Sequence, residues 1–378
     1  MPLPSDVLPS DETCPPGLRS AVETYTDQGG LLGAFTYALV DLETVDEALA
    51  ATMAEIPTNL FVTSSLHDDA IDEAEAWDDR KRRLNEHVTA GDLVFTNVIE
   101  AAHAVPADVD LAPVLAVTRA IGTGQLREER LEPSSATPAD AIDRIEQRGA
   151  VWGDLAVALV RAVGGYSRVQ RDALRRVATN AMFVLTVADD VEDLPEDVDN
   201  GVASLPVALY DGDLAASEST AAVDAFLDSD APDRLGALVA DRRARLEAAA
   251  YEFGDTIYVP NERLLAAVHR ALTWYCESVC SIPVERTVPR AHQRDLRARL
   301  EADGTAKRRV LESVVSASPF DARVDRDALE EQVAPLPAEP LADVVVMLTH
   351  VQAVIDGIMN TSLADALATL ERRGASQS

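Results

Sequence analysis

Two short acidic stretches of the sequence carry the residues best suited to chemistry. Both follow the pattern Asp-Asp-x-x-Asp, which is given by Asp68, Asp69 and Asp72 in the first motif and by Asp189, Asp190 and Asp193 in the second. In a helix, the first and last aspartates of this pattern share one face. Clustered carboxylates repel one another unless water or cations bridge them. Two such motifs facing each other across a helical bundle would bind Mg2+, which takes oxygen ligands, keeps waters and contacts substrate phosphates.

Helices are the elements expected to position both motifs, because helical periodicity dominates the sequence and strand signals are scarce. Apolar residues recur at three- and four-residue spacing, for example at Leu155, Leu159 and Val163. Thr137 followed by Pro138 predicts a capped helix start. The predicted fold class is therefore all-α, with long helices that form a bundle.

The chain is expected to divide into three parts. Residues 1–16 are interpreted as a polar leader, residues 17–285 as the helical bundle, and residues 286–378 as a C-terminal helical extension. Loops are expected in Pro-, Asp- and Gly-rich stretches, at 104–113, 131–140, 193–201, 228–233 and 281–289. The longest apolar runs are far shorter than a membrane-spanning helix requires, so no transmembrane segment is expected.

The composition bears on partners and environment. The 378 residues include 33 Lys plus Arg against 65 Asp plus Glu, a formal net charge of −32 that is spread along the whole chain. Such a surface disfavours a nucleic-acid partner, because phosphate contacts need a basic stripe. Lysine is nearly absent and aromatic residues make up 4%, which favours the solvated surface of a protein from a halophilic archaeon over an acidic partner-binding surface. Three cysteines fit a reducing cytoplasm without a disulfide framework.

The motifs and their flanks resemble the trans-isoprenyl diphosphate synthases, the polyprenyl synthetase family of class I isoprenoid synthases. The matching stretches are SLHDD (65–69), AGDLV (90–94), GTGQL (122–126) with Gln125, and GVASLPVAL (201–209), in the family's order and near its spacing. The resemblance implies the class I isoprenoid synthase helical bundle and an allylic prenyl diphosphate as substrate. It further implies that the six motif aspartates bind Mg2+ and act in catalysis. A homodimer, or a heterodimer with a related synthase, is expected on the same basis.

The sequence departs from the family where a second diphosphate would bind. The family has Gly-Gly-Lys-Arg-x-Arg-Pro near its N-terminus, whereas Leu31 and Leu32 follow Gly29 and Gly30 here. Leucine cannot replace the cations that hold a free diphosphate, so the second binding site is expected to be weakened.

Other family residues are replaced as well. Trp77 and Asp78 stand at the family's Arg-Arg-Gly, Arg148 and Gly149 at its Lys-Thr, Leu185 and Thr186 at its Phe-Gln, and Val202 at a lysine. The candidates for substrate contacts are therefore Arg80, Arg82, Arg83 and Arg148, together with Gln125 of the matching stretch. By resemblance, Thr63 and Ser64 lie at the floor of the hydrocarbon tunnel, and their small size predicts a prenyl chain of C20 or longer.

Three functions remain open on these grounds. The first is single-substrate chemistry of the terpene-synthase type, in which an allylic diphosphate ionises and the cation cyclises or loses a proton. The second is chain elongation with isopentenyl diphosphate, for which the arginines named above would rebuild the second site. The third is a non-catalytic subunit that pairs with an active synthase. The intact aspartate motifs and the missing cations favour the first function slightly over the second.

Overall fold

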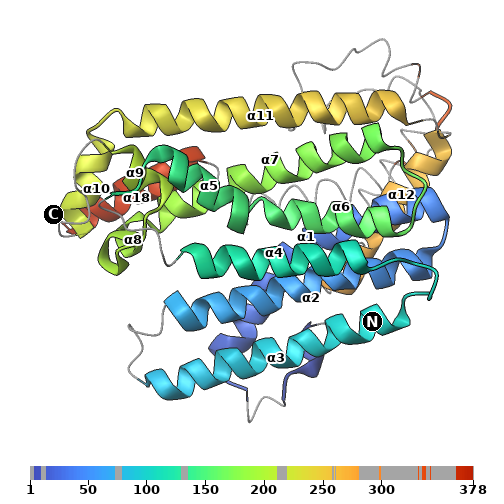
Figure 1. Ribbon diagram of the computed structural model, residues 1–378, viewed down its shortest axis with the longest axis horizontal. Helices are drawn as coiled ribbons and strands as arrows, with labels where there is room; N and C mark the ends of the chain where they lie inside the picture. Colours follow the sequence, from blue (N-terminus) through green and yellow to red (C-terminus); the bar gives the residue numbers. More distant parts are fainter. Residues whose placement is uncertain are drawn as a thin grey trace. The chain divides into compact units, whose positions relative to one another are not determined.

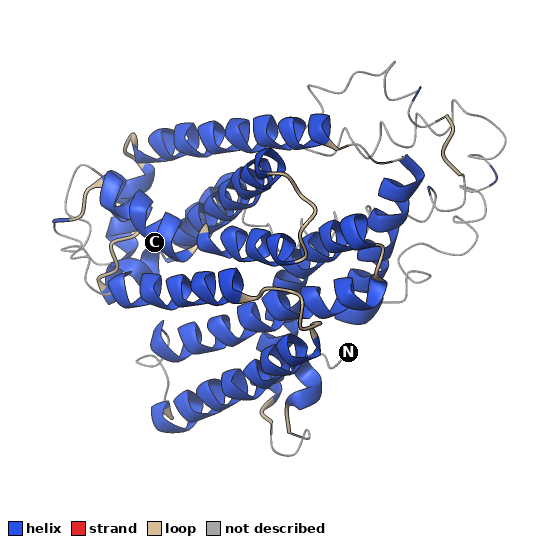
Figure 2. Cartoon of the chain, turned by 45° about the vertical axis from the view of Figure 1, so that its right-hand side comes forward, coloured by secondary structure: helices blue, strands red, loops and turns tan. Residues whose placement is uncertain are grey.

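The computed structural model describes residues 4–9, 14–72, 79–128, 135–210, 219–257, 261–280 and 363–377, with a few isolated positions elsewhere. Every regular element in these ranges is a helix (Figure 2), which confirms the predicted all-α class. The contacts group the chain into two units, Met1–Val109 with Tyr258–Ile355 and Asp110–Ile257 with Asp356–Ser378. Each unit thus combines an early segment of the chain with a late one. The boundary expected at residue 285 adjoins residues outside the described ranges and stays a prediction.

The first unit is built on three consecutive long helices (Figure 1). Its elements are η1 (Pro4–Val7), α1 (Pro16–Thr44), α2 (Glu47–Asp72), α3 (Arg80–Ala104), α12 (Asn261–Thr273) and η3 (Trp274–Val279). Helix α1 packs against α2, and α2 packs against α3, while α12 and η3 return to α1. The first aspartate motif lies at the end of α2, the first of the two helices of the α2–α3 hairpin.

A small hydrophobic core, which we call the N-terminal cluster, lies where η1, α1, α2 and α3 meet. Its buried members are Leu8, Cys14, Leu18, Val22, Val62, Leu66, Ala90 and Val94, with Val7 and Tyr25 packed against them. Leu8 and Cys14 belong to the segment interpreted as a polar leader, yet they are buried with this core. The start of the chain therefore supports the helices that carry the first motif.

The second unit is arranged around helix α7 (Figure 1). Its elements are α4 (Ala112–Glu128), α5 (Pro138–Arg148), α6 (Val151–Ala162), α7 (Arg168–Glu192), α8 (Leu194–Asn200), α9 (Leu205–Leu209), α10 (Ser219–Leu227), α11 (Ala231–Thr256) and α18 (Leu363–Gln377). Helices α5, α6, α11 and α18 each pack against α7. The second motif lies at the end of α7, so several elements converge on it.

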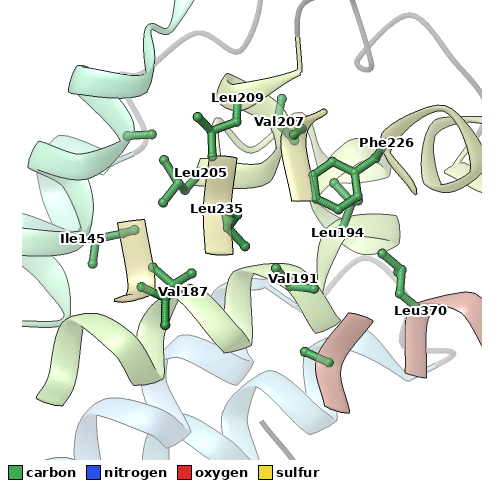
Figure 3. Packing of buried hydrophobic residues seen from close by; sticks show 14 of the residues in the cluster. Ile145, Val187, Val191, Leu194, Leu205, Val207, Leu209, Phe226, Leu235 and Leu370 are labelled. Atoms are coloured by element: carbon green, nitrogen blue, oxygen red, sulfur yellow. The ribbon is translucent and has the colours of Figure 1, made fainter. Parts of the chain in front are cut away.

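The core of the second unit follows the C-terminal half of α7. Figure 3 shows Val187 and Val191 of α7 in this cluster with Ile145 of α5, Leu205 of α9 and Leu370 of α18. Leu370 comes from the segment interpreted as a C-terminal extension, and it is fully buried. The last helix of the chain thus completes the core beneath the second motif.

Several local predictions can be compared with these elements. The capped start at Thr137 is confirmed, because its hydroxyl accepts a hydrogen bond from the Asp140 backbone and the Asp140 carboxylate accepts one in return. The loop predicted at 228–233 is shorter than expected, since α10 ends at Leu227 and α11 starts at Ala231. The loop predicted at 193–201 is wrong, because residues 194–200 form α8. The loop predicted at 281–289 lies outside the described residues.

Within the described ranges, no helix is both long and hydrophobic enough to cross a membrane.

Candidate functional site

Both aspartate motifs occupy the C-terminal ends of long helices. The first motif ends α2 at Asp72, and the second spans the end of α7 at Glu192 and its cap, Asp193. The C-terminus of a helix carries partial negative charge, so carboxylates placed there are electrostatically unfavourable. Each helix end therefore needs donors or cations nearby to hold its acidic residues in place.

At the first motif, Asp69 receives that support from two neighbouring helices. The Tyr25 hydroxyl of α1 donates a hydrogen bond of 2.7 Å to Asp69 Oδ1. His87 of α3 places Nε2 3.8 Å from Asp69 Oδ2, and only 15% of the Asp69 side chain is exposed. Asp68 is half-buried, whereas the side chain of Asp72 lies outside the described residues. The motif pattern indicates neither Tyr25 nor His87 as a partner, because both lie far from the motif along the chain.

The residues just before the first motif form the packing surface between α2 and α3. The buried Thr63 hydroxyl donates to the Gly91 carbonyl over 3.3 Å, and Ser64 is half-buried. A Cβ atom at Gly91 would lie only 2.5 Å from His67 Nε2, so the absence of a side chain there lets the histidine pack. The His67 Nε2 atom lies 3.5 Å from Asp92 Oδ1 of α3. His67 is therefore a packing residue of the hairpin in this structure.

The arginines that follow the first motif start α3. Arg80, Arg82 and Arg83 are all exposed, and Arg82 pairs with Glu86 over 2.8 Å. The Arg83 carbonyl accepts a hydrogen bond from His87 Nδ1 over 3.0 Å. These arginines thus lie within two turns of the histidine that faces Asp69. Trp77 and Asp78, where the family pattern breaks, lie outside the described residues.

At the second motif, Asp190 is buried and held by two protein donors. Arg144 of α5 contacts Asp190 Oδ1 at 2.5 Å, and the side chains are 7% and 9% exposed. The Leu205 backbone N–H, at the start of α9, donates to Asp190 Oδ2 over 3.1 Å. Both oxygens of Asp190 are therefore engaged by the protein, a role that sequence analysis did not anticipate. Arg144 could have been found from Arg148, which lies one turn later on the same face of α5.

The chain reaches Leu205 through the turn after α8. Gly201 caps α8 with φ +68°, a left-handed conformation that favours glycine. The Asp197 carboxyl of α8 has a pKa raised well above its ordinary value, first by desolvation and then by the charge of Asp190. The stretch GVASLPVAL (201–209) thus brings the backbone N–H of Leu205 to Asp190 of the second motif.

The two outer aspartates of the second motif have raised pKa values. Desolvation, followed by the charge of Asp190, raises the pKa of Asp189 to about 6, while Arg148 opposes the shift. Desolvation, followed by the charge of Asp189, raises the pKa of Asp193 to about 8. Both side chains nevertheless reach solvent, so water offsets part of this desolvation and a cation can approach from that side. A divalent cation would favour their ionised forms.

Arg148 is the predicted substrate-binding residue that the structure places beside an aspartate motif. It is half-buried at the end of α5, and its charge lowers the pKa of Asp189. The next residue, Gly149, allows close packing, because a Cβ atom there would lie 2.1 Å from Thr186 Oγ1 of α7. The side chain of the other candidate in this unit, Gln125, lies outside the described residues.

The place expected for a second diphosphate is the interior of a helix. Helix α1 runs without interruption for 29 residues, through Gly29, Gly30, Leu31 and Leu32. A Cβ atom at Gly29 would lie 2.9 Å from the Thr58 carbonyl, and one at Gly30 would lie 2.4 Å from Val279 Cγ1. These glycines therefore permit α2 and η3 to pack on α1. Their backbone N–H groups are committed to the helix, so this segment offers no phosphate-binding loop.

The donor set suits magnesium better than a softer metal. Among the described residues, no group of three or more His, Cys, Asp or Glu side chains is arranged to hold a metal ion. Mg2+ commonly binds through one or two carboxylates, with waters and substrate phosphates completing its octahedron. Asp189 and Asp193 are exposed residues, and a bound divalent cation would lower their raised pKa values, so they fit that mode. This mode of binding does not require all six motif aspartates to contact the metal directly.

Comparison with solved structures shows similarity of fold. Geranylgeranyl pyrophosphate synthase from Lactobacillus brevis superposes with a TM-score of 0.57 at 16% identity, over 71% of this chain and 92% of that one. The corresponding synthetase from Pyrococcus horikoshii gives 0.53 at 19% identity, over 71% and 93%. A polyprenyl synthase from Caulobacter crescentus, solved with calcium and isoprenyl diphosphate, gives 0.54 at 18% identity, over 71% and 90%.

No family model matches the sequence, and no curated protein matches it. The structural likeness therefore shows that this chain has the all-helical fold of the isoprenoid synthases.

Proposed function

We propose that this chain is a Mg2+-dependent isoprenoid synthase of the trans-isoprenyl diphosphate synthase family, which ionises one allylic prenyl diphosphate. The observation that carries the proposal is the pair of Asp-Asp-x-x-Asp motifs at the ends of α2 and α7 in an isoprenoid synthase fold. Clustered carboxylates at helix C-termini are costly unless a cation uses them. The fold and the motifs support the same chemistry independently.

The residues have distinct roles in this reaction. Each motif would hold Mg2+ through its outer aspartates, Asp68 and Asp72 in the first and Asp189 and Asp193 in the second. Arg148 offers a further cationic contact to the diphosphate. When bound, Mg2+ supplies Lewis-acid stabilisation of the leaving group. The bond from the prenyl C1 to the diphosphate oxygen breaks, diphosphate leaves with the electron pair, and the allylic cation cyclises or loses a proton.

Single-substrate chemistry is favoured because α1 contains no loop for a second diphosphate. Elongation would require a free isopentenyl diphosphate to dock, and Leu31 and Leu32 occupy the helix where the family has cations. A charged ligand without cationic partners would not bind tightly to a protein of net charge −32. The terpene-synthase type of reaction avoids this requirement.

Elongation is the second candidate, and the exposed arginines at the start of α3 favour it. Arg80, Arg82 and Arg83 lie within two turns of His87, which faces the first motif. They could bind a second diphosphate from α3 instead of α1. On this alternative, removing these arginines should strongly lower the affinity of this chain for isopentenyl diphosphate.

One incubation distinguishes the candidates. The purified chain, in high-salt buffer with Mg2+, is mixed with a C15 or C20 allylic diphosphate, with and without isopentenyl diphosphate, and the products are identified by mass. Release of diphosphate and a hydrocarbon without isopentenyl diphosphate supports the proposal. Longer prenyl diphosphates, formed only with it, would establish elongation instead. No product under either condition would contradict catalysis and favour the non-catalytic subunit.

Variants test the assigned residues. Asp68→Asn with Asp72→Asn, and separately Asp189→Asn, should each reduce turnover by at least about a hundredfold, since metal-held electrostatic stabilisation dominates such reactions. Asp224→Asn, which changes an exposed aspartate of α10, is the matched control and should leave turnover unchanged.

We further propose that Ser64 limits the length of the substrate chain. Thr63 is committed to the Gly91 carbonyl, so the half-buried Ser64 is the better candidate at this level of α2. Ser64→Phe should shorten the longest accepted allylic diphosphate. An unchanged chain-length preference would contradict this role.

A further inference from the structure

The end of α2 combines two features that call for an anchor. It carries three aspartates within residues 68–72, and it is the negative end of a helix of 26 residues. A helix end of this kind frays unless a tertiary contact holds its last turn. Two of the contacts that reach this turn are made by Asp69 with neighbouring helices.

Two side chains from different helices hold Asp69. The Tyr25 hydroxyl reaches Oδ1 at 2.7 Å from a position 44 residues earlier in the chain. The His87 Nε2 atom approaches Oδ2 at 3.8 Å, within reach of a direct charge contact or a bridging water. With 15% of Asp69 and 13% of His87 exposed, bulk water screens these contacts only partly.

Each partner is itself held in place. Tyr25 packs against the N-terminal cluster, to which the start of the chain contributes Leu8 and Cys14. The Nδ1 atom of His87 lies 3.0 Å from the Arg83 carbonyl, and a carbonyl can only accept, so Nδ1 carries a proton and Nε2 faces Asp69. Neither side chain can turn away from Asp69 without losing other contacts.

Helix geometry separates this anchor from the first aspartate of the motif. Asp69 points about 100° around the helix from Asp68. Holding Asp69 therefore fixes the rotation and the last turn of α2 without using the face that carries Asp68.

We propose that Tyr25 and His87 are positioning residues that hold the end of α2 through Asp69, so that Asp68 is presented to metal-bound diphosphate. The part that concerns the metal rests on the proposed function. The part that concerns the helix end does not, because it follows from the contacts alone.

Hydrogen exchange measured by mass spectrometry tests the helix end directly. In Tyr25→Phe, amides of residues 64–72 should exchange about tenfold faster than in the wild type, since a hydrogen bond to a charged group is lost. His87→Asn should give a smaller acceleration in the same segment. Tyr251→Phe, at a partly exposed tyrosine of α11, is the matched control and should leave residues 64–72 unchanged. Unchanged exchange in Tyr25→Phe, or equal acceleration throughout α1, α2 and α3, would overturn the positioning role.

A magnesium titration tests the consequence for the metal. The melting temperature is measured against Mg2+ concentration at fixed inorganic diphosphate, for the wild type and for Tyr25→Phe. The Mg2+ concentration that gives half of the maximal rise in melting temperature should be about three- to tenfold higher in the variant, because the aspartates at the end of α2 must be ordered before they bind Mg2+. An equal midpoint would overturn the metal part of the inference. A wild type that Mg2+ and diphosphate do not stabilise would contradict the proposed function, and the exchange experiment would still decide whether the anchor exists.

Discussion

The ends of α2 and α7 carry the same aspartate pattern but hold it with different chemistry. At α7, Asp190 lies in a buried ion pair with Arg144 and also accepts a backbone N–H from Leu205. At α2, Asp69 accepts a tyrosine hydroxyl and faces a histidine. In both motifs the second aspartate ties the helix end to its neighbours. The difference is one of strength, because a buried charge that loses its partner costs far more than a partly exposed hydrogen bond.

The largest expected effect comes from removing the α7 anchor. Arg144→Met leaves Asp190 buried without its cation and should lower the free energy of unfolding by about 3–5 kcal/mol. Arg144→Met with Asp190→Leu removes both charges and should recover much of that loss. Urea denaturation measures the free energy of unfolding of both variants. Arg176→Met, which breaks an exposed pair with Glu252, is the control and should cost less than about 1 kcal/mol. Equal losses in Arg144→Met and Arg176→Met would contradict the buried anchor.

The close approach of α5 to α7 gives the next largest effect. Gly149→Ala would place a Cβ atom 2.1 Å from Thr186 Oγ1, so we expect a loss of about 1–3 kcal/mol from overpacking. Thr186→Ala in the same chain should relieve part of it. Gly236→Ala, at an open position within α11, should be neutral or stabilise by up to about 1 kcal/mol. The comparison fails if Gly149→Ala behaves like Gly236→Ala in thermal denaturation.

The α2 anchor should matter less for overall stability. Asp69→Asn keeps the size of the side chain and removes its charge, so the Tyr25 hydroxyl loses a charged acceptor. We expect a cost of about 1 kcal/mol, against about 3 kcal/mol for Asp190→Asn, which leaves Arg144 buried beside a neutral amide. Chemical denaturation of the two variants side by side measures the difference. A cost for Asp69→Asn equal to that of Asp190→Asn would remove the distinction between the two helix ends.

The smallest effect is a dependence of stability on pH at the second motif. The pKa values of Asp189 and Asp193 are raised to about 6 and about 8 from 3.8, so the folded state holds protons that the unfolded state releases. Their contribution to stability is therefore present at low pH and is lost as pH rises from about 4 to about 8. Mg2+ should reduce that loss, because it favours the ionised carboxylates.

Melting temperatures at pH 5, 6.5 and 8, with and without Mg2+, check this prediction. Asp193→Asn isolates the local effect from that of the overall net charge, and its melting temperature should vary less with pH than that of the wild type. If the melting temperatures of the wild type and Asp193→Asn vary identically with pH, the second motif is not the cause of the pH dependence.

Helix formation follows from local sequence, and the sequence therefore predicted it well. Apolar periodicity and capping residues act over a few positions, so the all-α class and the capped start at Thr137 could be found without the structure. Composition misled at 193–201, where Pro, Asp and Gly suggested a loop. Pro195 stands in the first turn of α8, where proline is tolerated, and Gly201 ends the helix.

The candidate site was predicted only in part for the same reason. The acidic motifs are local patterns, and both lie at helix ends. Gly29 and Gly30 matched a family pattern, yet their surroundings show them within α1, packed against Thr58 and Val279. A glycine pair has the same letters in a phosphate loop and in a close helix contact, so only its neighbours in space distinguish the two.

By itself, the sequence determined the helices, the acidic composition and the presence of two Asp-Asp-x-x-Asp motifs, because these depend on residue type and on spacing within a few turns. The tertiary structure alone decided which aspartate in each motif is an anchor. Tyr25, His87, Arg144 and Leu205 lie 15 to 46 residues from the aspartates they contact. Such pairings arise from helix packing, in which burial and close contact select partners that no local pattern specifies.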